Sequence, residues 1–383
     1  MRIYWEADPK LYRLPFSQKP SLRKFDNKFE ALREANGKIS RVRFSFFEEA
    51  FDKLDWTKEP PDDWETMLLN RAQQLRDTYS YLRLWYSGGV DSHTALLTFL
   101  KAGIPLDEIA THQCSPIDDY NDPGNIEVAN RAIPYLKFIE KEIPKTKITI
   151  LNIGSKEFQK IFSDKNEDIE RWFLHKNDWD VRSVISTPSL YYLFPELERP
   201  VRGTHTLGDI IGEQKPRLRR GEDGTYYAIH LDHILTYHTG RDAKYNEYFY
   251  ITPDYPELHL KQCHLLKNTL KENHPDMYDL KPFWKNPGPY VEEYNEGIRY
   301  PCWNEVNLGK FDFPERRGIY SWVASKKGYY VLKTMRNYHP EIFQRFIGQF
   351  EYVETKFLKY FNDPTQAQSH ISSLWGKEYN LGK

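Results

Sequence analysis

Short runs of apolar and aromatic residues alternate with helical stretches between residues 79 and 245. The apolar runs have the length of strands and are separated by turn residues and by segments long enough to form helices. Strands that alternate with helices predict an α/β fold, in which helices cover both faces of a parallel sheet. The predicted strands are residues 82–86, 108–113, 147–152 and 200–204, and the predicted helices are residues 93–103, 127–142 (interrupted by Pro134) and 156–162.

The flanking segments have different patterns. Residues 41–46 alternate like a strand, and residues 64–78 carry an apolar helical stripe. Residues 215–230 predict a β-hairpin around an Asp-Gly turn. Farther along the chain helical stretches dominate, such as residues 258–272 and 340–361. The sequence therefore predicts a lead-in segment (residues 1–78), an α/β domain (residues 79–245) and a mostly helical C-terminal domain (residues 246–383).

Composition narrows the functional class. The chain has 383 residues, with 54 Lys and Arg against 55 Asp and Glu, so no global basic field favours nucleic acid. The three cysteines, Cys114, Cys263 and Cys302, are far apart and form no Cys-x-x-Cys pair, which argues against a zinc ribbon or dithiol motif. We find no apolar leader and no run of membrane-spanning length. We therefore expect a cytoplasmic protein, in the host cytoplasm if it is viral; its oligomeric state is left open.

Residues 87–92, Ser-Gly-Gly-Val-Asp-Ser, lie between a predicted strand and a predicted helix. A Gly-rich turn that leads into a helix N-terminus directs backbone N–H groups at one point, where phosphate binds well. Gly88 and Gly89 let the backbone approach the anion, and the Asp91 carboxylate can hold Mg²⁺. The motif matches neither Gly-x-x-x-x-Gly-Lys-Ser/Thr nor Gly-x-Gly-x-x-Gly. The predicted phosphate-binding residues are Ser87, Gly88, Gly89, Val90, Asp91 and Ser92.

Further candidates follow other predicted strands, since ligands of such sheets bind beyond the strands' carboxyl ends. His112 and Cys114 end the second strand, where a base or ribose would lie, but ordinary packing explains them as well. His93 is either a phosphate contact or a surface residue. His205 follows the predicted strand at residues 200–204 and is expected at the same edge.

Two polar segments each have two interpretations. Lys215 and Arg217 can form a second anion site for the substrate, because arginine neutralises anions bidentately, or they can belong to a solvated hairpin. Asp118, Asp119 and Asp122 can bind Mg²⁺, although such clusters are more often turns.

The loop at residues 87–92 resembles the pyrophosphate-binding loop of the adenine nucleotide α-hydrolase-like superfamily, the PP-loop ATP pyrophosphatases. Over residues 50–235 the chain resembles the phosphoadenosine phosphosulfate reductase-like proteins of large-genome bacteriophages. The resemblance implies an adenine nucleotide α-hydrolase-like fold that binds ATP or another adenine nucleotide, with Ser87, Gly88, Gly89, Asp91 and Ser92 on the phosphates. It is carried by Trp56, Glu59, Pro60, Arg71, Ala72, Leu75, Arg76, Tyr79, residues 87–92 and residues 212–217.

Sulfonucleotide reductases of this kind use a nucleophilic cysteine near the C-terminus, whereas the tail of this chain contains none. The first hypothesis is therefore an enzyme that cleaves ATP to AMP and pyrophosphate and adenylates an unidentified acceptor. Asp91, Lys215 and Arg217 are its candidate catalytic residues, with Mg²⁺ on Asp91 and His112 near the nucleotide. The alternatives are a sulfonucleotide reductase that uses Cys302 or Cys114, and a non-enzymatic nucleotide-binding protein; modification of a nucleic acid is a variant of the first hypothesis.

Overall fold

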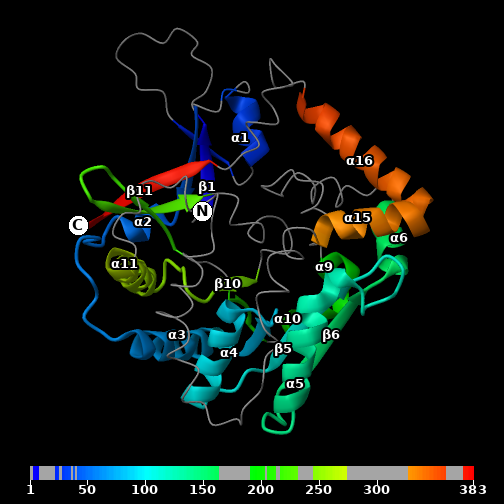
Figure 1. Cartoon of the computed structure of the whole chain (residues 1–383), viewed down its shortest axis with the longest axis horizontal. Helices are drawn as coiled ribbons and strands as arrows, with labels where there is room; N and C mark the ends of the chain where they lie inside the picture. Colours follow the sequence, from blue (N-terminus) through cyan, green and yellow to red (C-terminus); the bar gives the residue numbers. More distant parts are fainter. Residues whose placement is uncertain are drawn as a thin grey trace.

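The computed structural model of the chain (Figure 1) describes residues 3–7, 22–25, 28–35, 38, 41–163, 190–202, 205–212, 216–231, 245–273, 327–358 and 374–383. Within them, no helix is long and apolar enough to cross a membrane.

A five-stranded parallel sheet confirms the predicted α/β class. The chain runs from β4 outward to β5 and β6, then continues on the other side of β4 with β7 and β10, giving the order β10-β7-β4-β5-β6. Because the order reverses between β4 and β7, the carboxyl ends of these two strands form the switch point where such sheets bind ligands. The strands are β4 (Tyr81–Trp85), β5 (Glu108–Cys114), β6 (Lys147–Ile153), β7 (Leu207–Ile211) and β10 (Asn246–Tyr248).

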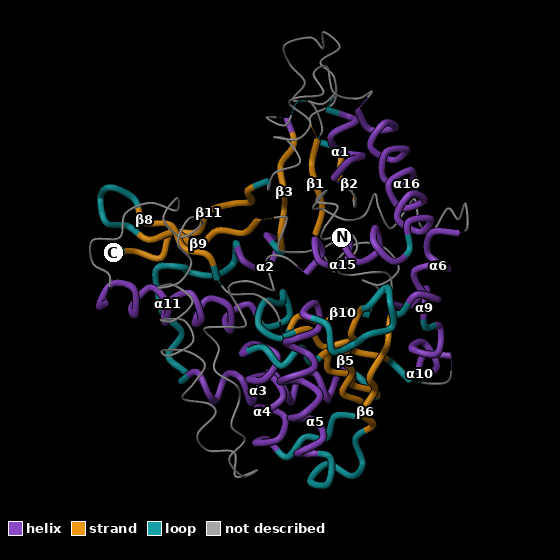
Figure 2. The backbone as a smooth tube through the Cα atoms, turned by 45° about the vertical axis from the view of Figure 1, so that its right-hand side comes forward, coloured by secondary structure: helices purple, strands orange, loops and turns teal. Residues whose placement is uncertain are grey.

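Helices flank this sheet (Figure 2). Leu82 and Leu84 of β4 pack in the main core with α3 (Trp64–Thr78) and α4 (Val90–Ala102). Trp85 faces the other way, as strand alternation requires, and packs with a smaller cluster around Tyr191. The remaining flanking elements are the π-helical turn η3 (Val128–Ala132), α5 (Ile133–Ile139), α6 (Ser155–Ser163), α9 (Leu190–Leu193), η4 (Pro195–Glu198) and α10 (Arg199–Arg202).

Local signals explain why these helices begin and end where they do. The Asp63 carboxylate caps α3 by accepting a hydrogen bond from the Thr66 N–H at 2.8 Å. Gly103 ends α4 with a φ of 67°, a conformation that glycine adopts without strain. Pro134 lies directly after the π-helical turn η3 and does not divide the predicted helix, because the helical stretch is continuous over residues 126–139.

Two antiparallel sheets lie beside the α/β part. One has the order β2-β1-β3, and the other, β11-β9-β8, contains the predicted hairpin with Gly224 at a φ of 83°. The C-terminal strand β11 lies next to β3, so distant parts of the chain meet there (Figure 2). The elements are β1 (Ile3–Ala7), β2 (Arg23–Phe25), α1 (Lys28–Glu34), β3 (Val42–Phe46), α2 (Glu48–Phe51), β8 (Arg217–Arg220), β9 (Tyr226–Leu231), α11 (Pro256–Asn273), α15 (Lys327–Tyr338), α16 (Pro340–Leu358) and β11 (Trp375–Gly382).

Two expectations need revision. The predicted strand at residues 200–204 is wrong: Arg199–Arg202 form the helix α10, and the fourth strand is β7, whose Gly208 and Asp209 weaken its apolar pattern. The mostly helical C-terminal domain is not confirmed either. Although α11, α15 and α16 are helical, β10 pairs with β7 in the parallel sheet and β11 pairs with β9. The division expected between residues 245 and 246 therefore falls at the start of a strand of the parallel sheet.

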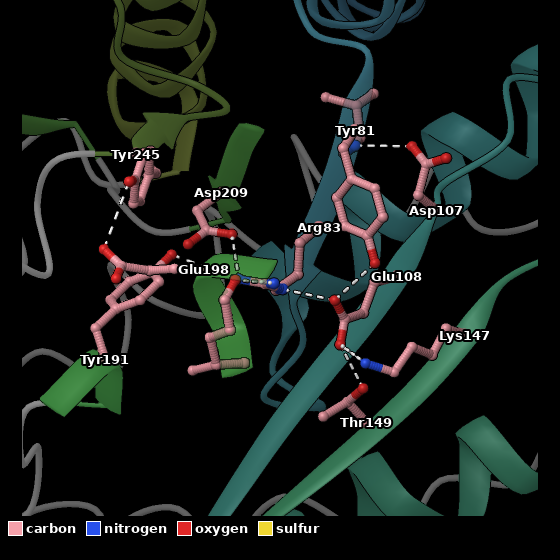
Figure 3. A network of polar contacts seen from close by, with 12 residues as sticks. Tyr81, Arg83, Asp107, Glu108, Lys147, Thr149, Tyr191, Glu198, Asp209 and Tyr245 are labelled. Atoms are coloured by element: carbon pink, nitrogen blue, oxygen red, sulfur yellow. Dashed lines mark hydrogen bonds and ion pairs between the residues drawn. The ribbon is translucent and has the colours of Figure 1, made fainter. Parts of the chain in front are cut away.

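One arginine connects the three central strands. Arg83 of β4 stands in register with Glu108 of β5 on one side and with Asp209 of β7 on the other. Its guanidinium donates to Glu108 Oε2 at 2.8 Å and to Asp209 Oδ1 at 3.1 Å, and Nη2 donates to the Leu197 carbonyl at 2.7 Å (Figure 3). All three charged side chains are at most 1 % exposed. The network therefore ties β5, β4 and β7 together laterally in a region without solvent screening.

One guanidinium serves two buried carboxylates, so the two carboxyl groups titrate differently. Burial alone would raise the pKa of Glu108, but Arg83 together with hydrogen bonds from Thr149 and Lys147 lowers it to about 2. Burial raises the pKa of Asp209 to about 7, because the attraction of the shared Arg83 only partly opposes it. Asp209 is therefore the titratable member of the network near neutral pH.

Replacing Arg83 leaves two buried carboxyl groups without their common partner. We expect Arg83→Met to lower the free energy of unfolding by about 3–5 kcal/mol, measured by urea unfolding. Arg23→Met is the matched control, because its ion pair with Glu34 is exposed and is worth at most about 1 kcal/mol. Equal effects of the two substitutions would contradict the structural role of Arg83.

The raised pKa of Asp209 predicts a pH dependence of stability. The folded protein retains this proton up to about pH 7, whereas the unfolded chain loses it near the ordinary aspartate pKa of 3.8. The stabilising contribution of the protonated form is therefore complete below about pH 4 and is lost as the pH rises to about 7. We expect the wild type to lose stability relative to Asp209→Asn over this range, by up to about 1.4 kcal/mol per pH unit. A constant difference between the two proteins across urea titrations at several pH values would exclude this titration.

Candidate functional site

Residues 87–92 occupy the switch point of the sheet. They follow β4 directly, and α4 begins within them at Val90 with Gly89 as its N-cap residue. The predicted order of strand, loop and helix is confirmed. The first N–H groups of a helix have no acceptor within the helix and carry its positive dipole end. The loop therefore presents backbone donors beyond the carboxyl end of the central strand.

Two serine hydroxyls brace the loop from inside. Ser87 Oγ and Ser92 Oγ lie 3.0 Å apart, and the Gly89 N–H donates to Ser87 Oγ at 3.2 Å. Ser92 Oγ in turn accepts from the Ser87 N–H and donates to the Gly89 carbonyl, each at 3.2 Å. These bonds hold both hydroxyls beside the N-cap of α4, close to any anion that binds there.

Neighbouring backbone segments approach the loop too closely for larger side chains. Gly88 has a φ of 77°, and a Cβ added there would lie 2.8 Å from the Ala132 backbone nitrogen of η3. A Cβ on Gly212, just after β7, would lie only 2.6 Å from Ser92 Cα. Both glycines are therefore required by the packing of η3 and of the β7 end against the loop.

Asp91 lies in the first turn of α4, where it is contacted by Tyr250, which follows β10 in the chain. The Tyr250 hydroxyl donates to the Asp91 carbonyl at 2.7 Å. Among the residues that the structure describes, no group of three or more His, Cys, Asp or Glu side chains could hold a metal ion. An Mg²⁺ ion at Asp91 would therefore take most of its ligands from phosphate oxygens and water, as Mg²⁺ commonly does.

The candidates on and near β5 have different environments. His112 is half-buried on β5, its ring edge-on to Trp85 at a centroid distance of 6.3 Å. Cys114 ends β5 and is fully buried; its N–H and C=O both pair with the Asn125 side chain, at 2.8 and 2.9 Å. His93 is 4 % exposed and hydrogen-bonds Tyr86, so it is a core residue and not a surface residue.

The acidic loop after β5 forms turns and caps. The Asp118 carboxylate accepts hydrogen bonds from the Ser155 N–H and hydroxyl, at 2.9 and 2.7 Å, at the start of α6. Asp119 accepts from the Asn121 N–H at 3.1 Å, and Asp122 accepts from the Gly124 N–H at 2.7 Å. These contacts favour the turn interpretation over Mg²⁺ binding.

His205 is not at the expected edge. Because the fourth strand is β7 and not residues 200–204, His205 precedes the strand and pairs with Ser80, which precedes β4, at 3.2 Å. Arg217 is half-buried in β8, in the antiparallel sheet and not in the sheet that carries the loop. Lys215 and Cys302 lie outside the described residues.

Sequence reasoning missed the supports of the loop. Gly212 is predicted only as part of residues 212–217, and Tyr250 falls within the predicted C-terminal domain. Neither has a local signal for its role, because each contact spans more than a hundred residues. The aromatic residues among residues 245–250, which include the short strand β10, are the one signal that the sequence offers here.

No protein family and no curated protein matches the chain. The function must therefore be argued from the geometry of the loop and from the resemblance of its motif.

The close approach at Gly212 predicts an asymmetry between glycines. Gly212→Ala should lower the free energy of unfolding by about 1–3 kcal/mol, because its Cβ meets the Ser92 backbone and not a movable side chain. Gly348→Ala in α16 is the control: nothing lies within 4 Å of its Cβ, and alanine should stabilise the helix by about 0.5–1 kcal/mol. If urea unfolding shows Gly212→Ala to be as stable as the wild type, the β7 end does not pack against the loop in this way.

Proposed function

We propose that this chain binds ATP through residues 87–92 and cleaves it between the α- and β-phosphates. The observation that carries the proposal is the position of the Ser-Gly-Gly-Val-Asp-Ser loop beyond the carboxyl end of β4, at the switch point, with α4 beginning inside it. A doubly wound sheet binds nucleotides at this point. An anion there meets the helix N-terminus, and the two serine hydroxyls are held beside it. The fold we propose is adenine nucleotide α-hydrolase-like.

The reaction proposed is an adenylyl transfer. An oxygen of the acceptor attacks the α-phosphorus, the bond to the oxygen bridging to the β-phosphorus breaks, and pyrophosphate leaves with the electron pair. A second nucleophile then displaces AMP from the acceptor. Backbone N–H groups of the first turn of α4 would stabilise the charge on the leaving pyrophosphate, and the hydroxyls of Ser87 and Ser92 would add to this by turning from their hydrogen bonds within the loop toward the phosphate. Asp91 would hold Mg²⁺ on the phosphates, and positioning supplies the remainder of the rate enhancement.

In this proposal the other candidate residues contact parts of the ligands other than the phosphates. His112 would lie toward the nucleoside, because it is on the strand next to β4. Lys215 and Arg217 would serve an anionic part of the acceptor, since the chain between them and Gly212 is short. The acceptor itself stays open.

The environment of the cysteines gives no support to a reductase. Reduction of a sulfonucleotide needs a reactive thiolate. Cys114 and Cys263 are both fully buried, and burial raises the pKa of the Cys263 thiol well above its ordinary value. We therefore do not propose this activity for the described cysteines.

The proposal is tested by nucleotide binding and product analysis. We expect the protein with Mg²⁺ to bind α,β-methylene-ATP in calorimetry, and we expect Asp91→Ala to weaken binding by at least about tenfold, or 1.4 kcal/mol. With ATP and a set of acceptors containing carboxylates, amides or nucleobases, the products should be AMP and pyrophosphate. Glu140→Ala, at an exposed position after α5, is the matched control and should behave like the wild type.

Three outcomes separate the hypotheses. Release of ADP and phosphate, or no binding of the analogue by the wild type, would overturn the proposal. Tight binding that depends on Asp91 without turnover of ATP with any acceptor would favour a non-enzymatic nucleotide-binding protein.

A further inference from the structure

Tyr250 reaches the phosphate loop from a part of the chain that lies outside the α/β domain expected from the sequence. Its side chain is fully buried, and its hydroxyl donates to the Asp91 carbonyl at 2.7 Å. That carbonyl belongs to the first turn of α4, so it also accepts the regular helical hydrogen bond from four residues on. The tyrosine therefore adds a second donor to a peptide group that adjoins the proposed phosphate contacts.

The Tyr250 ring is fixed by aromatic neighbours. It stacks on Trp64 of α3 at a centroid distance of 6.4 Å, with 20° between the planes. It also meets Phe249 edge-on at 4.9 Å. Aromatic contacts of this geometry favour one ring orientation, so the hydroxyl is directed at Asp91 before any ligand arrives.

A buried arginine fixes the backbone that carries the tyrosine. Arg71 of α3 is 2 % exposed, and its guanidinium donates to the Tyr248 carbonyl at 2.8 Å and to the Phe249 carbonyl at 3.2 Å. The same group pairs with Glu247 Oε2 at 3.2 Å. Because the planar guanidinium forms all of these bonds at once, it sets the path of the chain out of β10.

We infer that Tyr250 is a positioning residue for nucleotide binding, with Arg71 as its support. The inference rests on the proposed function and deepens it. By holding the Asp91 peptide, the hydroxyl keeps the Asp91 side chain and the adjacent N–H groups in the arrangement that phosphate and Mg²⁺ need. The free protein thus carries a loop that is already ordered, which lowers the entropic cost of binding.

Tyr250→Phe removes the hydroxyl and retains the ring, so it isolates this contact. When the full chain is titrated with α,β-methylene-ATP in the presence of Mg²⁺, we expect this substitution to raise the dissociation constant of the analogue about tenfold. Tyr379→Phe is the matched control. Tyr379 lies on β11 in the antiparallel sheet β11-β9-β8, and the substitution removes a hydroxyl that donates to Asp52 Oδ1 at 3.1 Å. We expect both variants to have similar urea midpoints, with only Tyr250→Phe changing the affinity. A purely structural hydroxyl would shift the midpoint and leave the affinity unchanged.

Arg71→Lys provides a second test, because it alters the side chain that holds the backbone next to Tyr250. Lysine keeps the charge near Glu247 but cannot donate to both carbonyls in the same planar geometry. We expect it to weaken analogue binding in the same direction as Tyr250→Phe. If the wild type binds the analogue and both variants bind it equally well, the inference is overturned while the proposed function stands. If the wild type does not bind the analogue, both are overturned.

Discussion

The buried guanidinium of Arg83 is the interaction on which the geometry of this sheet depends. It lies in one row with Glu108 and Asp209, so a single positive group contacts a carboxyl group on each neighbouring strand. Moving either strand by one residue would turn its carboxyl group to the other face and leave the arginine buried with one partner fewer. Removing these charged groups from water costs free energy that opposes the attraction between them. The main effect of the network is therefore to exclude other registers of the strands. Two strands fixed in this way, β4 and β7, carry the ends that meet at the switch point.

The loop at residues 87–92 depends on the fixed positions of β4 and β7, because its own contacts tolerate little movement. Gly88 faces the backbone of η3, and Gly212 faces the backbone of Ser92. Neither contact has a flexible side chain that could absorb a shift, so displacement of β7 relative to β4 would reach the N-terminus of α4 directly. The loop itself carries no lysine or arginine, so any attraction of its own residues for an anion would come from oriented N–H groups, hydroxyls and the helix dipole. Groups of this kind act only where they converge, which makes their fixed positions necessary.

The sequence predicts the elements with local signals and misses those held by distant contacts. The bounds of α3 are recovered because Asp63 caps it and its stripe is regular, and the hairpin is recovered because an Asp-Gly turn has one preferred geometry. The strand β7 is missed because Asp209 looks like a surface residue until Arg83 is known to lie beside it. The strand β10 has only three residues, and it depends on Arg71, which is far away in sequence. The loop itself is predicted, but its supports are not, since Tyr250 and Gly212 are identified only by the folded structure.

The dependence of the loop on distant segments bears on how the chain is divided. The backbone N–H donors lie on α4, and the backbone segments that approach the loop closely are η3 and the end of β7. The hydroxyl that donates to the Asp91 carbonyl belongs to Tyr250, which follows β10 in the chain. The support of that hydroxyl is Arg71, which precedes the sheet. A fragment of residues 79–245 would lose Arg71, β10 and Tyr250 together, and it would expose the edge of β7 that pairs with β10. The unit that packs around the loop, for which we propose nucleotide binding, therefore extends at least from α3 to Tyr250. In that unit the aromatic residues around position 250 belong to the site and not to a separate helical domain.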